Sequence, residues 1–143
     1  MSKKETVKAL NKLLQGEHMA IEAFNIYINE VDDEYMKKTF QKIQNQHRDN
    51  MTVLSNYIQD LGYKPDEKLG LKGVMGDFMV NMELAGDTDS SYVINKAIKG
   101  ENQGINMAEK VLRGKLDQTS RTLAGEILKK DRESLSKLEE LRH

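Results

Sequence analysis

The chain has 143 residues, of which 31% are charged, and its formal net charge of −1 gives no strong field toward nucleic acid or a membrane surface. There is no cysteine, which excludes a disulfide framework, thiolate catalysis and sulfur-ligated metals. No apolar run approaches the roughly 18 residues of a membrane-spanning helix and no signal-peptide core is present, so we expect one cytoplasmic domain over residues 1–143.

The first two predicted elements are long amphipathic helices joined by a short turn. Ser2 and Glu5 form the capping-box pattern at the start of the first helix. Its apolar stripe recurs at helical spacing, at Val7, Leu10, Leu14, Ile21, Phe24, Ile28 and Val31. The acidic stretch 32–34 ends that stripe and favours a new helix N-terminus. The second helix carries Met36, Phe40, Ile43, Met51, Leu54, Ile58 and Leu61 and is predicted to stop at residues 62–65.

A glycine-rich connection follows, and residues 71–84 within it are predicted to form a short methionine-rich helix. The third long helix is predicted to begin near residues 87–91, with Ile94, Ala97, Ile98, Ile105, Ala108 and Leu112 on one face. Residues 113–119 turn the chain, and the fourth helix shows Ala124, Ile127, Leu128, Leu135, Leu138 and Leu141. The fold class is therefore predicted to be all-α. Two antiparallel hairpins would be joined by a crossover of roughly 25 residues that leaves the second and third helices parallel.

One ionisable residue interrupts each apolar stripe. These residues are Glu17, His47, Glu101 and Asp131. Each lies about 15 residues from the turn of its own hairpin, or about 22 Å along the helix, so we expect the four at one level inside the bundle. Three carboxylates in an apolar interior cannot all stay ionised without a cation or shared protons. Carboxylate and imidazole donors suit iron, manganese or zinc, and a hydrogen-bonded core without metal is the alternative.

The two glutamates belong to a short near-repeat at an offset of 84 residues. Asn11, Lys12, Gly16 and Glu17 correspond to Asn95, Lys96, Gly100 and Glu101. A glycine within a helix costs about 1 kcal/mol relative to alanine. We therefore expect these glycines either to allow close packing of helices or to leave space beside the polar residues.

The sequence resembles the ferritin-like four-helix di-iron carboxylate proteins of the rubrerythrin and bacterioferritin type. It is most similar to the small bacterial ferritin-like proteins of poorly defined function. The resemblance rests on "LLQGEHMAIEAFNIYI", "IQNQHRDNMTVLSNYIQDLGYKP" and "AIKGENQGINMAEKVL" and spans nearly the whole chain. The superfamily pattern is Glu on the first and third helices and Glu-x-x-His on the second and fourth. Glu17, His47 and Glu101 match this pattern, whereas Gln44 replaces a glutamate, Asp131 shortens another and Ser134 replaces a histidine.

The resemblance implies a partly degenerate metal site formed by Glu17, His47, Glu101, Asp131 and Gln44, the last through a neutral oxygen. We expect one bound ion or a weak, asymmetric pair, with iron favoured, manganese or zinc as alternatives, and no haem. An enzymatic role would be that of a ferroxidase or peroxide-reducing di-iron oxidoreductase in iron handling or the oxidative-stress response. The expected partners are the metal ion and further copies of the chain, in a homodimer or larger homo-oligomer.

A different class of function is also open. A metal-free helical scaffold that has lost the site would act through contacts with other proteins. Outside the polar layer, His18 is expected to be exposed, because it lies about 100° round the helix from Glu17. Tyr27 and Tyr57 are expected near the ends of the bundle.

Overall fold

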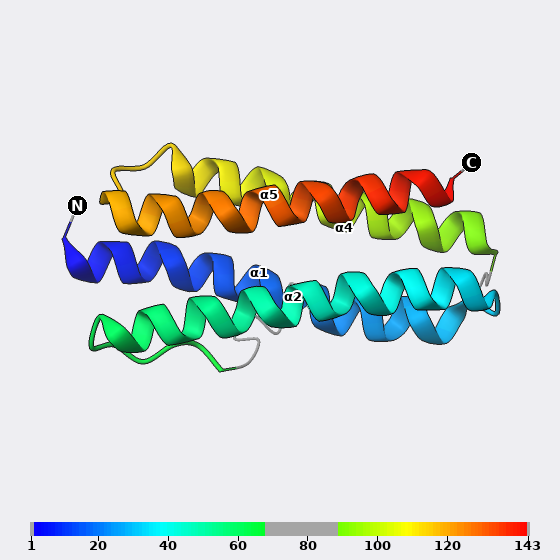
Figure 1. Ribbon diagram of the computed structural model, residues 1–143, viewed down its shortest axis with the longest axis horizontal. Coiled ribbons are helices and arrows are strands. Elements are labelled where there is room, and N and C mark those ends of the chain that lie inside the picture. Colours follow the sequence, from blue (N-terminus) through cyan, green and yellow to red (C-terminus); the bar gives the residue numbers. More distant parts are fainter. Residues whose placement is uncertain (1, 68–88, 143) are drawn as a thin grey trace.

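The computed structural model describes residues 2–67 and 89–142, and every regular element within these ranges is an α-helix. The helices are α1 (Lys3–Glu30), α2 (Glu34–Asp60), α4 (Ser90–Leu112) and α5 (Gln118–Leu141). Figure 1 shows two antiparallel hairpins side by side, α1 with α2 and α4 with α5. Helix α2 ends at one end of the bundle and α4 begins at the other, so these two helices run in the same direction. The short helix predicted at residues 71–84 lies outside the described residues.

Side-chain caps fix where the helices begin. The Ser2 hydroxyl accepts a hydrogen bond from the Glu5 amide at 3.1 Å, and the Glu5 carboxylate returns to the Ser2 backbone, which confirms the predicted capping box. At the other three N-termini, an aspartate side chain accepts a bond from an amide two or three residues later; these are Asp33, Asp89 and Asp117. The starts of the four helices in the described ranges therefore follow from local sequence.

The end of α2 is equally well defined. The Gly62 amide donates to the Gln59 carbonyl and the Tyr63 amide to the Ile58 carbonyl, which is the Schellman arrangement. Gly62 has a φ of 87°, a left-handed conformation that glycine adopts without steric cost. The predicted stop at residues 62–65 is confirmed.

Beyond that stop, the chain folds back onto α1. The Asp66 amide donates to Asn11, and the Gln15 amide donates to the Asp66 carboxylate at 3.1 Å. His18 contacts the Asp66 carbonyl through Nε2 at 2.9 Å and is only partly exposed. The expectation that His18 is exposed was wrong, because residues remote in sequence cover it.

The apolar core falls into two clusters. One contains Leu10, Leu14, Leu54, Ile58, Ile105, Ala124 and Ile127, and the other contains Phe24, Tyr27, Phe40, Ile43, Ile94, Ala97 and Leu138. Along every helix, the ionisable residue of the stripe falls between the two clusters. The bundle therefore places a polar layer between two apolar segments. No described helix is long and apolar enough to cross a membrane.

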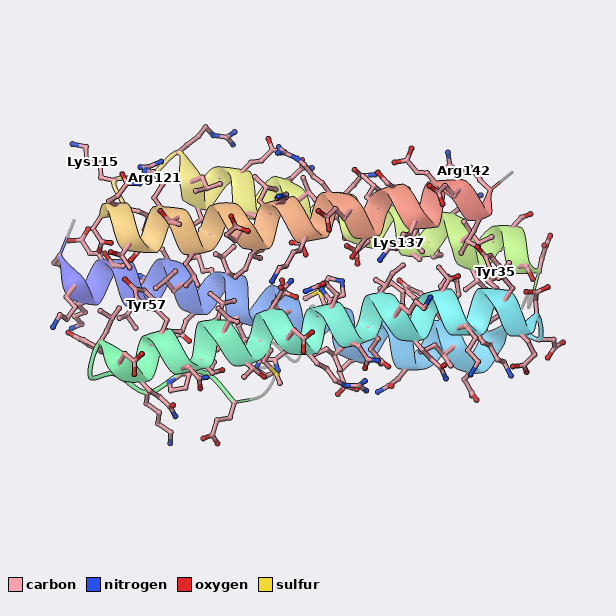
Figure 2. All side chains as sticks on the ribbon, viewed as in Figure 1. Tyr35, Tyr57, Lys115, Arg121, Lys137 and Arg142 are labelled. Atoms are coloured by element: carbon pink, nitrogen blue, oxygen red, sulfur yellow. The ribbon has the colours of Figure 1, made fainter. Side chains whose placement is uncertain are left out.

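The two tyrosines occupy different environments. Tyr27, three residues before the end of α1, is 1% exposed and packs edge-to-face on Phe24, so it lies near a bundle end as expected but is buried in the second cluster. Tyr57 lies near one end of the bundle, where its hydroxyl meets that of Ser120 on α5 at 2.9 Å. Figure 2 also shows long charged side chains such as Lys115 and Arg142 projecting away from the helices.

Candidate metal centre

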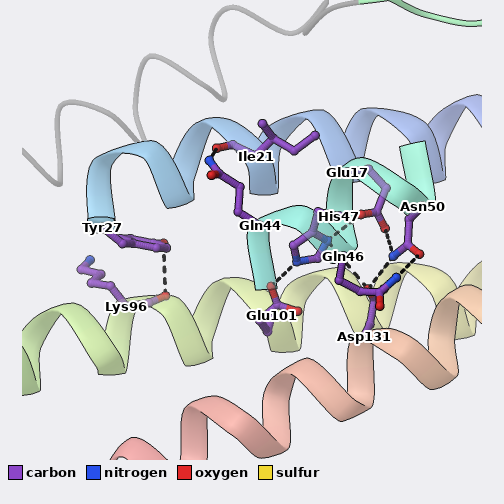
Figure 3. Close-up of polar contacts among 10 residues, drawn as sticks. All are labelled: Glu17, Ile21, Tyr27, Gln44, Gln46, His47, Asn50, Lys96, Glu101 and Asp131. Atoms are coloured by element: carbon purple, nitrogen blue, oxygen red, sulfur yellow. Dashed lines mark hydrogen bonds and ion pairs between the residues drawn. The ribbon is translucent and has the colours of Figure 1, made fainter. Parts of the chain in front are cut away.

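The polar layer receives one ionisable side chain from each helix. Glu17, His47, Glu101 and Asp131 come from α1, α2, α4 and α5, and each is only 4% exposed. Figure 3 shows the four side chains converging from different helices. All four residues that the sequence singled out therefore meet in one layer, as their equal distances from the two turns predicted.

His47 is the centre of this layer. Its Nδ1 lies 2.6 Å from Glu17 Oε2, and its Nε2 lies 2.5 Å from Glu101 Oε1. Each ring nitrogen faces a carboxylate oxygen, so a ring protonated on both nitrogens, the imidazolium ion, satisfies both contacts. Burial lowers the pKa of His47, but the charges of Glu101 and Glu17 and the hydrogen bonds to them outweigh burial and leave the pKa well above 6.5.

Asp131 completes the layer without a direct bond to the imidazole. Its Oδ1 lies 3.9 Å from His47 Nδ1. Burial, which is the largest cause, and the charges of Glu17 and Glu101 together raise the pKa of Asp131 from 3.8 to about 8, while the charge of His47 opposes them. Asp131 is therefore mainly protonated at neutral pH. Without metal, two bound protons, one on Asp131 and one on the His47 imidazole, reduce the negative charge of the layer.

Asn50 belongs to the layer although the sequence analysis did not single it out. It is 1% exposed, and its Nδ2 donates to Asp131 Oδ1 at 3.3 Å and to Glu17 Oε1 at 3.5 Å. Gln46 in turn donates to Asn50 Oδ1 at 3.3 Å. Asn50 could have been found from the sequence, because it follows His47 by three residues and so lies on the same face of the helix. The predicted stripe instead used Met51, which is partly exposed.

Gln44 and Ser134 are both buried in the positions that a glutamate and a histidine hold in the di-iron pattern. The Gln44 amide donates to the Ile21 carbonyl at 2.9 Å and to Asn25 Oδ1 at 2.7 Å, so it faces α1 and not His47 (Figure 3). Neither residue adds a charge. The layer therefore has three carboxyl groups and one imidazole.

Three of the four ionisable residues have potential ligand atoms close to one another. Glu17, His47 and Asp131 each offer one such atom, and these atoms lie within 4.8 Å of one another. Two carboxylates and an imidazole suit iron, manganese or zinc, so the donor set fits a metal of this kind. Glu101 contacts the other ring nitrogen of His47, Nε2. It is therefore placed to hold the imidazole of a ligand histidine by accepting its other N–H.

The glycines of the near-repeat leave space. A Cβ placed on Gly100 would lie 3.6 Å from the Tyr27 hydroxyl, and one on Gly16 would lie 3.8 Å from the Met107 sulfur, both ordinary contacts. A Cβ on Gly104 would meet nothing within 4 Å. Close packing of helices therefore does not require these glycines. Of the two expectations for them, space beside the polar layer is the one that the structure supports.

Several solved structures with the same architecture are described as ferritin-like or bacterioferritin-related. The ferritin-like domain of a two-domain protein from Anabaena variabilis, which also has a DJ-1/ThiJ/PfpI-like domain, matches at a TM-score of 0.80 and 22% identity. The match covers 99% of this chain but only 37% of that protein. The bacterioferritin-related protein of Bacteroides fragilis, described as a dodecameric thioferritin, matches at 0.79 and 16% identity, over 98% of this chain and 85% of its own.

A ferritin-like di-iron carboxylate protein from Bacillus anthracis matches over the full length of both chains, with a TM-score of 0.73 and 21% identity. At these identities the likeness establishes the fold. No curated protein is significantly similar to the sequence. The family model described as a domain of unknown function, DUF2383, matches residues 5–114. The chain therefore belongs to the DUF2383 family, and its fold is that of the ferritin-like four-helix proteins.

Proposed function

We propose that this protein binds a divalent transition metal through Glu17, His47 and Asp131. The observation that carries the proposal is the convergence of their ligand atoms within 4.8 Å in a buried layer. The electrostatics support it, because two bound protons there perform the neutralising role that a cation can take over. The supporting residues are Glu101, which orients the imidazole, and Asn50, which holds the two ligand carboxyl groups.

Iron is the metal we favour, with manganese and zinc as alternatives. The neighbours described as a di-iron carboxylate protein and as a thioferritin support this choice. Bound iron would supply one-electron redox chemistry with oxygen or peroxide, which suits iron handling or an oxidative-stress response. Before binding, His47 Nδ1 and the Asp131 carboxyl group must each release a proton. Gln44 is the weakest candidate ligand, because its amide is already bonded to α1.

One bound ion is expected in preference to a symmetric pair. The two neutral replacements, Gln44 and Ser134, remove a carboxylate and an imidazole from the di-iron pattern. Three carboxyl groups neutralise two divalent ions less well than four. We also propose that the chain acts in the cytoplasm as a single domain in a homodimer or a larger assembly, the latter by analogy with the dodecameric neighbour.

A metal-free scaffold is the second candidate. Among the described residues, every buried side-chain nitrogen and oxygen has a hydrogen-bond partner, so the polar layer is fully hydrogen-bonded without a metal ion. A protein of this kind would use its surface and not the layer. The two candidates differ in whether any metal binds.

Anaerobic calorimetric titration of chelator-treated protein with Fe(II), Mn(II) and Zn(II) separates them. We expect one equivalent to bind to the wild type and none to Glu17→Ala or His47→Ala. If no metal binds to the folded wild type, the metal proposal fails and the scaffold remains. If one equivalent binds but Fe(II) is oxidised no faster than in buffer, metal binding stands and the ferroxidase role fails.

A further inference from the structure

A cavity of about 360 Å³ lies between α1 and α4, beside the polar layer. Its walls include Gly16 and Ala20 of α1 and Gly100 and Gly104 of α4. All four ionisable residues of the layer also line it, and their burial makes them its inner wall. The cavity therefore extends to the candidate metal ligands.

Most of the residues that line the cavity are uncharged. Although 31% of the chain is charged, the described residues around the cavity carry no charged group apart from the polar layer itself. Phe24, Tyr27 and Met107 supply apolar or weakly polar walls. An anion would find no lysine or arginine there and would face Glu17 and Glu101. The walls suit a neutral ligand whose surface is mostly apolar.

The missing side chains create the space. Gly104 has no atom within 4 Å of where its Cβ would be, and Gly100 and Gly16 have only ordinary contacts there. An engineered apolar cavity of roughly 150 Å³ is enough to bind benzene. The cavity of about 360 Å³ has room for a molecule larger than a single aromatic ring.

We propose that this cavity is a binding site for a neutral, largely apolar small molecule of about two fused rings, held against the polar layer. Binding needs only the cavity. The second part of the proposal is that the bound molecule takes part in the chemistry of the metal, and this part rests on the proposed function. The cavity is lined by Glu17, His47 and Asp131, so a bound molecule would lie beside the atoms that we propose as metal ligands.

Indole is a suitable probe, because the chain has no tryptophan and indole can be excited where tyrosine does not absorb. The titration uses chelator-treated full-length protein, so it is independent of metal. We expect saturable binding of one equivalent, with a blue shift and raised anisotropy of indole emission. Indole-3-carboxylate, which adds one negative charge, is expected to bind more weakly by about tenfold or more.

Filling the cavity tests its position. Gly104→Leu is expected to weaken indole binding by about tenfold or more, because Gly104 lines the cavity and the added side chain would occupy part of its space. The variant should fold, since leucine has the higher helix propensity and a Cβ at this position meets no atom within 4 Å. Gly125→Leu is the matched control: it also lies in a helix with nothing within 4 Å, but outside the cavity. It should bind indole like the wild type.

Several results would overturn the proposal. They are no indole binding by the wild type, equal binding by Gly104→Leu, or equal affinity for the carboxylate. An indole affinity that falls as protein concentration rises would show that a second copy of the chain covers the cavity, and would also overturn it. A failed metal titration leaves the indole result standing, so the two proposals fail separately.

Discussion

The two hairpins carry the same Gly-Glu motif, yet their glutamates hold different positions around one histidine. Glu17 in the first hairpin faces His47 Nδ1 and also receives the amide of Asn50. Glu101 in the second hairpin faces only Nε2. An ion that binds Nδ1 thus meets Glu17 and not Glu101.

This difference arises because the first hairpin contributes a histidine to the layer, His47, and the second hairpin does not. The second hairpin has Ser134 where the di-iron pattern has its other histidine. A repeated motif therefore places two carboxylates at one level, but the single imidazole between them makes one a proposed metal ligand and the other the residue that orients the imidazole. Four experiments test that assignment.

The largest effect is expected from His47→Ala. It removes the only imidazole of the layer and leaves three buried carboxyl groups without their cation, which should cost about 3–5 kcal/mol of unfolding free energy. Metal affinity should fall by more than about 100-fold. Urea denaturation and metal titration measure the two effects. His18→Ala, at the contact with Asp66 and outside the layer, should leave metal affinity unchanged. Wild-type metal affinity in the His47 variant would contradict the site.

The next effect separates the two glutamates. Glu17→Gln removes a proposed ligand and should lower metal affinity by about 100-fold, whereas Glu101→Gln removes a partner of the ligand and should lower it by about tenfold. Competition with a chromophoric chelator measures both. Equal losses would refute the division of roles, and a larger loss in Glu101→Gln would place the ion at Nε2.

The stability of the metal-free protein should fall as pH rises. Folding raises the pKa values of Asp131, from 3.8 to about 8, and of His47, to well above 6.5. The folded state therefore holds these protons more tightly than the unfolded state. That contribution is complete below each ordinary pKa and is lost as pH rises through the folded value.

Urea denaturation of chelator-treated protein between about pH 6 and about pH 9 measures this loss. Asp131→Asn should flatten the part of the curve below about pH 8, because it removes one of the two groups. Metal affinity should change in the opposite direction and rise with pH, since the ion displaces the same protons. A wild-type stability that increases over this range would show that the layer does not hold the two protons.

The smallest effect is expected from Asn50→Ala. It removes the donor to Glu17 and Asp131, so the free energy of unfolding should fall by about 1–2 kcal/mol and metal affinity by about tenfold. Denaturation and chelator competition apply again. Asn45→Ala, on the exposed face of the same helix, is the control and should change neither quantity. An unchanged affinity in the Asn50 variant would remove Asn50 from the site.

Local sequence was enough for most of the fold. Caps such as Ser2 and Asp33 and the stop at Gly62 act over a few residues, so the helix bounds could be predicted. The polar residues in the four stripes could be predicted because a period of 3.6 residues places them on the buried face. Equal distances from the turns then placed them at one level.

Only the tertiary structure decided the finer arrangement. Asn50 and Met51 differ by about 100° around α2, and the packing of three other helices determines which one faces inward. His18 is covered by Asp66, 48 residues away, and no local pattern reports such a contact. The division of the two His47 nitrogens between Glu17 and Glu101, and the cavity beside Gly104, depend on how side chains of different helices fill one space. The sequence by itself thus determined which residues reach the layer, whereas their roles depend on distances between helices that periodicity does not encode.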